Sequence, residues 1–369
     1  MITEFNIEDL LQDKAPHQTK VVVAMSGGVD SAVAASLLHA LGYQVIGITM
    51  QLYNTEITSI KKSACCAGRD IYDAKRVADS IGFPHYILNY EAVFKKEVIE
   101  YFINSYVHGE TPVPCIKCNQ TVKFRDLLQV TKNLDADVLV TGHYVRRLEQ
   151  NGKVKLYTSI DKKKDQSYFL FSITEQQLQF LRFPLGWFYK NDIRKLAQYF
   201  GLQIFDKPDS QDICFVSESY NKTIAHLAPA SIQKGTIIDT EGKILGEHNG
   251  IINFTIGQRK GLGLNSHIPL YVIRLDIENN QVIVGTINYL MQKKIFIKEL
   301  NWLEKPKQDM TVLVKLRSSH TGSLATIHAS EEQNTACITL HDNHFGISPG
   351  QACVAYKDEQ VMGGGWIYI

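Results

Sequence analysis

The sequence predicts an α/β protein that starts with a doubly wound parallel sheet and continues into a small central α+β domain and a C-terminal antiparallel β-barrel. Three observations support this fold: apolar runs alternate with helical patterns up to about residue 205, turn-rich sequence follows, and short strand-like runs close the chain. Apolar strands separated by helices are typical of parallel sheets covered on both faces. Short strands separated by turn residues are typical of small barrels and sandwiches.

The first domain is expected over residues 1–205, where four apolar runs are the candidate strands. These runs are VVVAM (21–25), VIGITM (45–50), HYILNY (85–90) and DVLVTG (137–142). Helical patterns separate them, over about 31–41, 70–81 and 92–107. In such sheets a ligand binds beyond the carboxyl ends of the strands, so the residues that follow each run are candidates for a binding site.

The helical pattern fades in the rest of the chain. We expect a central α+β domain over 206–290, where GIINFTIGQRKGLGLN mixes strand residues with glycines. A β-barrel is expected over 291–369, from the strand-like runs TVLVKL, ATIHA, ACITL, ACVAY and WIYI. A length of 369 residues agrees with several domains, because it exceeds what one compact core usually holds.

The composition is that of an ordinary soluble chain. It is 44% hydrophobic and 21% charged, and its formal net charge of +1 neither indicates nor excludes a nucleic-acid partner. The first 20 residues carry four acidic side chains and lack a long apolar run, unlike a secretory or transit peptide. No run approaches the roughly 18 apolar residues of a membrane span. We therefore expect a cytoplasmic protein that does not bind membranes.

The chain has seven cysteines, an odd number that argues against a disulfide framework in the absence of an export signal. Cys337 and Cys353 fall in apolar strand-like runs and are expected in the core. The adjacent pair Cys65–Cys66 suits neither a disulfide nor joint metal binding, and we assign it no role. The remaining candidates for chemistry are Cys115, Cys118 and Cys214.

The strongest local signal is AMSGGVDS (24–31), which lies between the first strand and the first helix. Gly27 and Gly28 let the backbone approach an anion, and the start of the helix presents N–H groups and a positive dipole end. Ser26 and Ser31 add hydroxyl donors, while Asp30 is available to hold Mg²⁺ or to cap the helix. The residues expected to line this phosphate site are Ala24, Met25, Ser26, Gly27, Gly28, Val29, Asp30 and Ser31. The pattern is neither the Walker motif nor GxGxxG.

This loop resembles the pyrophosphatase loop of the ATP-pyrophosphatase superfamily, whose members transfer AMP to a substrate oxygen and release pyrophosphate. Three longer stretches narrow the resemblance: PCIKCNQTVKF (114–124), KDQSYFLF (164–171) and KPDSQDICF (207–215). With GHYVR, FPLG, FTIGQRKGLG, PGQA and GGGW they resemble, in order and over nearly the whole chain, the tRNA-specific 2-thiouridylase family. The resemblance implies an adenine nucleotide α-hydrolase-like first domain and ATP-dependent formation of 2-thiouridine at the wobble position (34) of tRNA.

The same resemblance implies roles for two cysteines. Cys214 of the ICF motif would carry a persulfide, and Cys118 of the CN…KF motif would be its partner. Replacement of the uracil oxygen by sulfur requires that the oxygen first becomes a leaving group, which adenylation by ATP achieves. The persulfide then supplies a nucleophilic sulfur, and the second thiolate releases it by closing a disulfide with the first.

Cys115 departs from the family pattern, because better-known members carry an Asp at this position, near the target base. Either another residue performs the acid–base chemistry, or Cys115, Cys118 and Cys214 hold a [4Fe–4S] cluster whose open iron would bind extra sulfide. A zinc site at Cys115-x-x-Cys118 would need two more ligands at comparable spacing, and the sequence offers none. We favour the two-cysteine mechanism and keep the cluster as the alternative.

The resemblance implies further contacts with both substrates. Met50 and Gly142 end two of the candidate strands and would contact ATP, although core packing explains an isolated Met as well. The implied tRNA contacts are His143, Lys164, Asp165, Gln166, Arg317, Ser318 and Gln351. Ser318 replaces an aromatic residue that is common there, so one stacking contact would be missing. Sequence-specific RNA recognition usually targets single-stranded loops, which fits an anticodon loop.

The implied partners are tRNA and a protein that delivers sulfur, either a sulfur-relay protein or a cysteine desulfurase, and we expect a monomer. Two other classes of function remain open. One is a small-molecule AMP-forming ligase of the same superfamily, which would give Cys118 and Cys214 no role. The other is a non-catalytic RNA-binding or iron–sulfur protein, which would give the intact SGGVDS loop no role.

Overall fold

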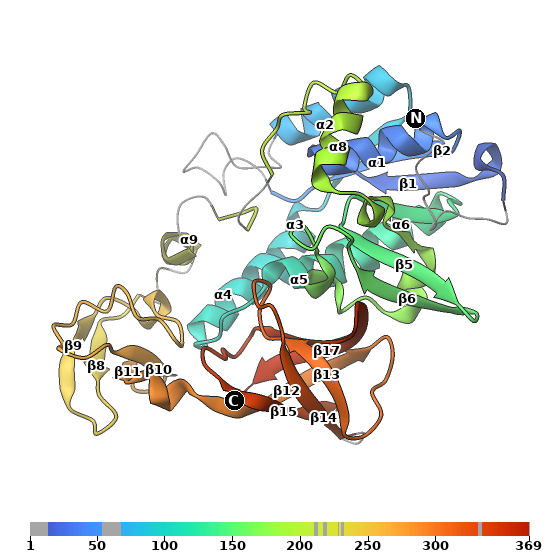
Figure 1. Ribbon diagram of the computed structural model, residues 1–369. Coiled ribbons are helices and arrows are strands. Elements are labelled where there is room, and N and C mark those ends of the chain that lie inside the picture. The colour runs from blue at the N-terminus through green and yellow to red at the C-terminus, as the bar shows by residue number, and fades with distance from the viewer. Residues whose placement is uncertain are drawn as a thin grey trace. The chain divides into compact units, whose positions relative to one another are not determined.

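The computed structural model describes residues 14–53, 68–209, 213–216, 220–227, 229, 232–330 and 334–368 (Figure 1). The chain divides into two compact units, of which the first comprises residues 1–98, 115–217 and 359–361. The second comprises residues 99–114, 218–358 and 362–369. The expected domain boundaries near 205 and 290 remain predictions, and the Cys65–Cys66 pair lies outside the described residues.

The first unit is built on a five-stranded parallel sheet with the strand order β3-β2-β1-β4-β7. Its strands are β1 (Lys20–Ala24), β2 (Gln44–Gln51), β3 (His85–Asn89), β4 (Val138–Thr141) and β7 (Leu181–Arg182). The three valines at the centre of β1 are fully buried, which explains why this strand is a continuous apolar run. The predicted parallel sheet is confirmed, whereas the short β7 was not predicted. The strand order reverses between β1 and β4, so their carboxyl ends form the switch point of the sheet.

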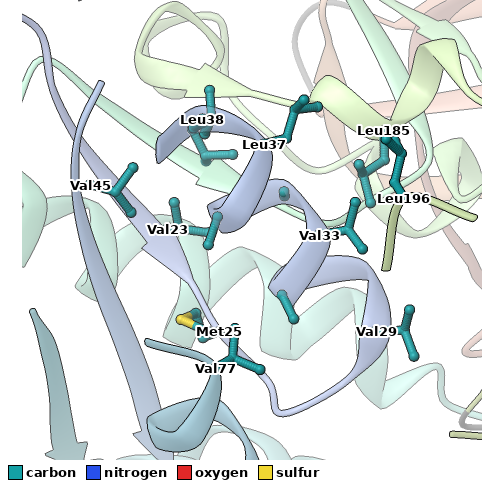
Figure 2. Close-up of a cluster of buried hydrophobic side chains, with 14 of the residues drawn as sticks. Val23, Met25, Val29, Val33, Leu37, Leu38, Val45, Val77, Leu185 and Leu196 are labelled. Carbon is teal, nitrogen blue, oxygen red and sulfur yellow. The ribbon is translucent and has the colours of Figure 1, made fainter. Parts of the chain in front are cut away.

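One face of this sheet is covered by α1 (Val29–Ala40), α2 (Arg69–Ile81) and α8 (Lys190–Tyr199) (Figure 1). Figure 2 shows Val23 of β1 together with Val33 and Leu37 of α1 in the core of this layer. The same core contains Met25, Val29, Leu38, Val45, Val77, Leu185 and Leu196. Nine of the twelve residues of α1 are buried, because α1 contacts the sheet, α2 and α8. The start of α1 is therefore fixed by packing on several sides.

The first unit is connected to two helical runs that matter for the predictions. One was expected to be helical, and the other contains the candidate cysteines Cys115 and Cys118. The helix expected over 92–107 is found as α3 (Glu91–Phe94), the π-helical η3 (Lys95–Ile99) and α4 (Glu100–Val107). A second run, which was not predicted, consists of α5 (Pro114–Cys118), the π-helical η4 (Asn119–Leu127) and α6 (Leu128–Asn133). α6 packs against β4 on the other side of the sheet from α1 (Figure 1). Short π-helical segments are frequent at functional sites.

A hairpin of β5 (Val145–Gln150) and β6 (Lys153–Thr158) follows β4. Residues 360 and 361, at the start of the last strand, pair with β6 and belong to the first unit. The remaining short helices of this unit are η2 (Pro16–Gln18), η5 (Ser167–Leu170), α7 (Glu175–Phe180) and η6 (Pro184–Trp187). Thr174 and Gln177 form a capping box that starts α7. In the described ranges, no helix is long and apolar enough to cross a membrane.

The second unit contains a four-stranded sheet with the order β10-β11-β8-β9. Its strands are β8 (Gly235–Ile238), β9 (Ile244–His248), β10 (Tyr271–Asp276) and β11 (Gln281–Gly285). The sheet is mixed, since β8 and β11 are parallel and the other pairs are antiparallel. The accompanying helices are α9 (Tyr220–Leu227), η8 (Ile251–Asn253) and η9 (Ile287–Leu290).

The second unit also contains the predicted antiparallel barrel. Its six strands follow the order β12-β15-β14-β13-β16-β17, and pairing of β12 with β17 closes it. They are β12 (Gln292–Trp302), β13 (Met310–Lys315), β14 (Ser323–Ser330), β15 (Thr335–His344), β16 (Ala352–Lys357) and β17 (Gln360–Tyr368). Cys353 is buried in the core as predicted, but Cys337 is only half-buried. Alternation along β15 explains this, because Ala336 and Ile338 take the inner face.

Candidate active site

The loop of residues 24–31 connects β1 to α1 at the switch point of the parallel sheet. Gly27 has a φ of +74°, and a Cβ atom placed on it would lie 2.3 Å from the carbonyl oxygen of Asp70. No other residue fits this position, because both its backbone conformation and the backbone of α2 exclude a side chain. The first of the two loop glycines therefore serves close packing of the loop on α2.

The start of α1 keeps its N–H groups directed at this loop. Gly28 is the N-cap and makes no side-chain capping bond. Ser31 is buried, and its Oγ accepts a hydrogen bond from the N–H of Ser26 (3.1 Å) and donates one to the Gly28 carbonyl (3.3 Å). Ser31 thus holds the shape of the loop, while the exposed Ser26 offers a hydroxyl to a ligand. Helix N-termini of this kind bind anions such as phosphate.

Asp30 is paired with a cation within the protein. Lys190 Nζ lies 2.6 and 2.8 Å from its two carboxylate oxygens, and the Tyr144 hydroxyl donates to Oδ1 at 2.7 Å. Burial and the negative charge of Asp30 raise the pKa of Tyr144, so this hydroxyl stays protonated. The alternative in which Asp30 caps α1 is wrong, because Gly28 occupies the cap position and the carboxylate points at Lys190.

Gly142 follows β4 and lies against the phosphate loop. A Cβ atom on Gly142 would lie 2.8 Å from the backbone nitrogen of Ser31 and 3.1 Å from the carbonyl carbon of Asp30. A small residue is therefore required here for β4 to approach the start of α1. Met50 is half-buried near the end of β2. Its contact with adenine remains a prediction.

His143, the next residue, is half-buried and held by several contacts. Its Nδ1 lies 2.7 Å from Thr141 Oγ1, and its ring packs between those of Phe124 and Phe183 at 6.0 and 6.4 Å. Burial and the positive charge of Lys123 hold the pKa of His143 well below its usual range. The imidazole is therefore neutral, and its proposed contact with tRNA would be that of a hydrogen-bonding group.

Two of the candidate cysteines lie on one helical run. Cys115 is in the first turn of α5, and Cys118 ends α5 where the π-helical η4 begins. A spacing of three residues places both on the same helical face. Cys115 is exposed and Cys118 is buried. Both thiols are free, so no disulfide joins Cys118 to Cys214 in this structure.

The protonation state of Cys118 follows from its surroundings. Burial raises the pKa of Cys118 to about 11, with Lys123 opposing the change and Cys115 adding to it. Burial also raises the pKa of the Cys115 thiol, against the opposing charge of Lys123, although the residue as a whole is exposed. Both side chains are therefore thiols at neutral pH. Lys123 is the cation that favours their thiolate forms.

Cys214 lies in the described segment 213–216 and is half-buried. Its carbonyl oxygen accepts a hydrogen bond from the Tyr53 hydroxyl at 2.9 Å. Phe215, which is buried, packs edge-on against Phe94 with ring centroids 5.8 Å apart. These contacts fix the backbone beyond Cys214. Across the described ranges, no group of three or more His, Cys, Asp or Glu side chains is placed to hold a metal ion.

The segment before Cys214 contacts the phosphate loop through charged residues that the sequence analysis missed. Lys207 donates to the Gly27 carbonyl, and Asp209 pairs with Lys190 and with Lys164. Lys207 and Asp209 stand in the KPDSQDICF stretch, so a signal for them existed in the motif itself. Lys190 had none, because nothing in the local sequence of α8 indicates that its side chain meets Asp30.

The other predicted RNA contacts of the first unit take part in local structure. Asp165 accepts hydrogen bonds from the backbone N–H groups of Ser159 (3.1 Å) and Ser167 (3.3 Å). Gln166 Oε1 accepts from the N–H of Tyr144 at 2.9 Å. Together with Lys164 they form a turn whose shape is fixed by these bonds, and their contacts with tRNA remain predictions.

In the second unit, Arg317 and Ser318 are exposed in the turn between β13 and β14. His320 shapes this turn, since its Nδ1 accepts a hydrogen bond from the N–H of Leu316 at 3.2 Å. Gln351 is half-buried, and its Nε2 donates to the carbonyl oxygen of Thr111 at 2.9 Å. An exposed Arg in a fixed turn is available to a phosphate group.

Models of known families match almost the whole chain in three parts. A model described as tRNA methyl transferase HUP domain matches residues 19–218, and one described as tRNA methyl transferase PRC-barrel domain matches residues 221–286. A model described as aminomethyltransferase beta-barrel domain matches residues 292–367. These models span the parallel-sheet unit, the four-stranded sheet and the barrel.

Curated relatives match the chain end to end. The tRNA-specific 2-thiouridylase MnmA of Wolbachia sp. subsp. Drosophila simulans (strain wRi) is 74% identical, with 100% of both chains covered. The protein of the same name from Ehrlichia ruminantium (strain Welgevonden) is 60% identical, again over 100% of both chains. That of Anaplasma marginale (strain St. Maries) is 54% identical over 98% of this chain and 94% of its own. The chain, with its phosphate loop at the switch point and its two motif cysteines, belongs to the tRNA-specific 2-thiouridylase family.

Proposed function

We propose that this protein converts the wobble uridine of tRNA to 2-thiouridine, with ATP as the activating substrate and a persulfide on Cys214 as the sulfur source. The observation that carries the proposal is the presence, in one compact unit, of a phosphate loop at a switch point and the motif cysteines Cys118 and Cys214. The names of the relatives describe the 2-thiolation of tRNA uridine, which supports the class of reaction. The products are 2-thiouridine, AMP and pyrophosphate.

In the first step the uracil O2 attacks the α-phosphorus of ATP, and the bond from that phosphorus to the bridging oxygen breaks. Pyrophosphate leaves into the loop of residues 24–31, where the start of α1 stabilises its charge. Mg²⁺ supplies charge neutralisation on the phosphates when it is bound with ATP. Such sites need only one or two protein carboxylates, and Asp30 fits that role if it shares its oxygens with Lys190.

In the second step the terminal persulfide sulfur of Cys214, as an anion, attacks C2 of the adenylated uracil, and AMP leaves. Cys118 thiolate then attacks Cys214 Sγ. The electron pair of the persulfide S–S bond moves to the sulfur on C2, which becomes the thiocarbonyl, and a Cys118–Cys214 disulfide forms. A thiol reductant regenerates both thiols, and a persulfide-donating protein reloads Cys214. Each cycle thus reduces one sulfane sulfur and oxidises two thiols.

These reaction steps require Cys118 to act as a thiolate although its pKa is raised to about 11. Lys123 is the cation that lowers the pKa, and burial opposes it. We infer that binding of the substrates changes the surroundings of Cys118 before it attacks, because a protonated thiol is a weak nucleophile. The half-buried Cys214 must also meet Cys118 during the cycle.

The tRNA is proposed to bind through its anticodon loop, with the target base unstacked to reach the cysteines. The residues that we assign to this contact are His143, Lys164, Asp165, Gln166, Arg317, Ser318 and Gln351. The enzyme is proposed to act as a cytoplasmic monomer that receives sulfur from a relay protein or a cysteine desulfurase. Contacts with phosphates would dominate its affinity for tRNA, which would then fall as salt rises.

A [4Fe–4S] mechanism on Cys115, Cys118 and Cys214 is the alternative. The three cysteines do not form such a ligand group among the described residues, so the arrangement does not fit a cluster as it stands. Cys115 therefore has a different proposed role, next to the target base, as the residue on the exposed end of the face that it shares with Cys118.

The test is nucleoside mass spectrometry of unmodified tRNA after anaerobic incubation with the enzyme, ATP and a persulfide donor. We expect 2-thiouridine from the wild type and from Cys115→Ser, and none from Cys214→Ser or Cys118→Ser. Cys337→Ser is the matched control, because Cys337 is a half-buried free thiol on the barrel.

Three results would change the proposal. Loss of activity in Cys115→Ser, together with bound iron and use of free sulfide, would establish the cluster mechanism. Pyrophosphate release that does not depend on tRNA would instead indicate a small-molecule ligase, and the absence of any release would indicate a non-catalytic RNA-binding protein.

A further inference from the structure

Residues 205–209 lead into the segment that carries Cys214, and three side chains attach them to the rest of the first unit. Lys207 and Asp209 reach out from the segment itself, and Arg194 of α8 holds its backbone. Arg194 donates to the carbonyl oxygens of Phe205 (2.8 Å) and Lys207 (3.2 Å). The position of this segment is therefore set by specific polar contacts and can be changed by single substitutions.

The first attachment is made by Lys207. Its Nζ donates to the carbonyl oxygen of Gly27 at 2.9 Å and pairs with Asp70 at 2.7 Å and Asp73 at 2.6 Å. Burial alone would lower the pKa of Lys207, but the hydrogen bonds to Asp70 and Asp73 raise it, so the ammonium stays charged. Lys207 thus joins three elements: the phosphate loop, α2 and the Cys214 segment.

The second attachment passes through Lys190. This side chain is 9% exposed and lies between two carboxylates, 2.6 Å from Asp30 of the phosphate loop and 2.8 Å from Asp209 of the segment. Lys164 (2.7 Å) and Arg194 (3.3 Å) also contact Asp209. Burial alone would raise the pKa of Asp209, but hydrogen bonds from Lys164 and Lys190 lower it, so the carboxylate stays charged.

Burial of a lysine ammonium group costs free energy unless the charge is paired. Here the two carboxylates that pair with Lys190 come from different parts of the chain. Asp30 belongs to the loop that receives pyrophosphate, and Asp209 stands five positions before Cys214. An alkyl side chain of similar length would pack at position 190 but would join neither carboxylate. We call the contacts Asp30–Lys190–Asp209 and Gly27–Lys207 the loop–segment bridge.

We propose that Lys190 and Lys207 are positioning residues that hold the Cys214 segment in register with the phosphate loop, so that sulfur transfer follows adenylation on the same base. The inference rests on the proposed function above. Water can hydrolyse the adenylated uridine back to uridine, so a persulfide that is out of place lowers the yield of 2-thiouridine for each pyrophosphate released. Release of the segment should therefore separate the two steps rather than abolish the first.

The experiment measures pyrophosphate and 2-thiouridine formed in the same reaction, with unmodified tRNA, ATP and a persulfide donor. Asp209→Asn is the principal variant, because it removes the bridge charge from the segment and leaves Asp30 and Lys190 in place. A misplacement on the order of 1 Å can cost about 10²-fold in rate, so we expect the ratio of 2-thiouridine to pyrophosphate to fall about tenfold or more. The KM for ATP in pyrophosphate release should stay near the wild-type value.

Lys190→Met and Lys207→Met should lower the same ratio, and Lys195→Met is the matched control. Lys195 lies on the same helix, is 76% exposed and pairs only with its neighbour Asp192 among the described residues. A second readout is the rate at which iodoacetamide alkylates Cys214, measured by peptide mass spectrometry. It should rise in the three bridge variants and stay unchanged in Lys195→Met, while the buried Cys353 stays unmodified in every folded protein.

Equal loss of pyrophosphate and 2-thiouridine, with an unchanged ratio and unchanged Cys214 alkylation, would overturn the proposal. So would a ratio that falls equally in Lys195→Met. If one variant exposes Cys353 and is therefore misfolded, the other two bridge variants decide the question. A wild-type protein that makes no 2-thiouridine would refute the proposed function, and the alkylation rates would still test the positioning of the segment.

Discussion

Replacement of Gly142 by Ala tests whether β4 holds the phosphate loop in place. The added Cβ would lie 2.8 Å from the nitrogen of Ser31 and 3.1 Å from the carbonyl carbon of Asp30. Both atoms belong to the backbone at the start of α1, so no side chain can rotate away to make room. Overpacking of this kind costs about 1–3 kcal/mol. Because α1 is packed on the sheet, α2 and α8, the easiest response is a shift of the loop at its start.

A displaced loop should bind ATP more weakly. Since about 1.4 kcal/mol corresponds to a tenfold change in Kd, a cost of about 1–3 kcal/mol expressed in binding predicts roughly 5- to 150-fold weaker binding. Isothermal titration calorimetry with ATP measures this change. The melting temperature, measured by differential scanning fluorimetry, should fall by about 2–4 °C for each kcal/mol lost from folding.

Gly152→Ala is the control. Gly152 has a φ of +73° in the turn between β5 and β6, and nothing lies within 4 Å of the position of its Cβ. This substitution strains the backbone by about 1–2 kcal/mol without touching the loop, so the melting temperature should fall and the Kd for ATP should stay the same. If Gly142→Ala behaves as Gly152→Ala does, with normal ATP binding, the argument that Gly142 positions the loop is refuted.

Three further predictions concern the cysteines and the barrel. Alkylation of Cys118 should be slow at pH 8 and accelerate up to about pH 11, where its pKa lies, and Lys123→Met should slow it further, as peptide mass spectrometry at several pH values would show. Tyr53→Phe removes the donor to the Cys214 carbonyl at a local cost of about 1 kcal/mol, so Cys214 should be alkylated faster while the melting temperature changes little. Burial lowers the pKa of His320 to about 4, below its unfolded value of 6.5, so the unfolded state binds more protons between these values. Stability should therefore fall as pH drops from 6.5 to 4, and His320→Gln should flatten the melting temperature over this window; a parallel fall in both proteins would contradict this.

The sequence predicted the parallel sheet because strands that are buried on both faces appear as continuous apolar runs. β1 reads as a run of valines, and its neighbours are equally apolar. The run over 114–133 was not recognised as helical, because η4 (Asn119–Leu127) is largely polar and its π-helical turn breaks the usual spacing of apolar residues. β12 was missed for a different reason: Phe296, between the buried Ile295 and Ile297, is apolar but exposed, so the sequence does not alternate where the burial does.

Parts of the candidate site that lie within one short stretch of sequence were predictable, and contacts between distant residues were not. The loop of residues 24–31 was predictable because its chemistry is contained in eight consecutive residues. The pairing of Asp30 with Lys190 was not, because it joins residues 160 positions apart. Sequence showed a carboxylate available for Mg²⁺ or a cap, and only the packing of α8 on α1 reveals the ammonium group that it contacts.

The β6 strand has a neighbour that is synthesised much later than β6 itself. Residues 360 and 361 pair with β6, and Glu359 forms ion pairs with Arg146 and Lys162, so the first unit includes residues near the end of the chain. During translation the parallel sheet can form long before these residues leave the ribosome, but the edge of β6 stays bare until they do. Bare strand edges are the usual starting points of wrong pairing. The edge of β6 therefore stays unpaired for a long interval after the parallel sheet has been synthesised, and removal of residues 359–369 would leave that edge permanently unpaired.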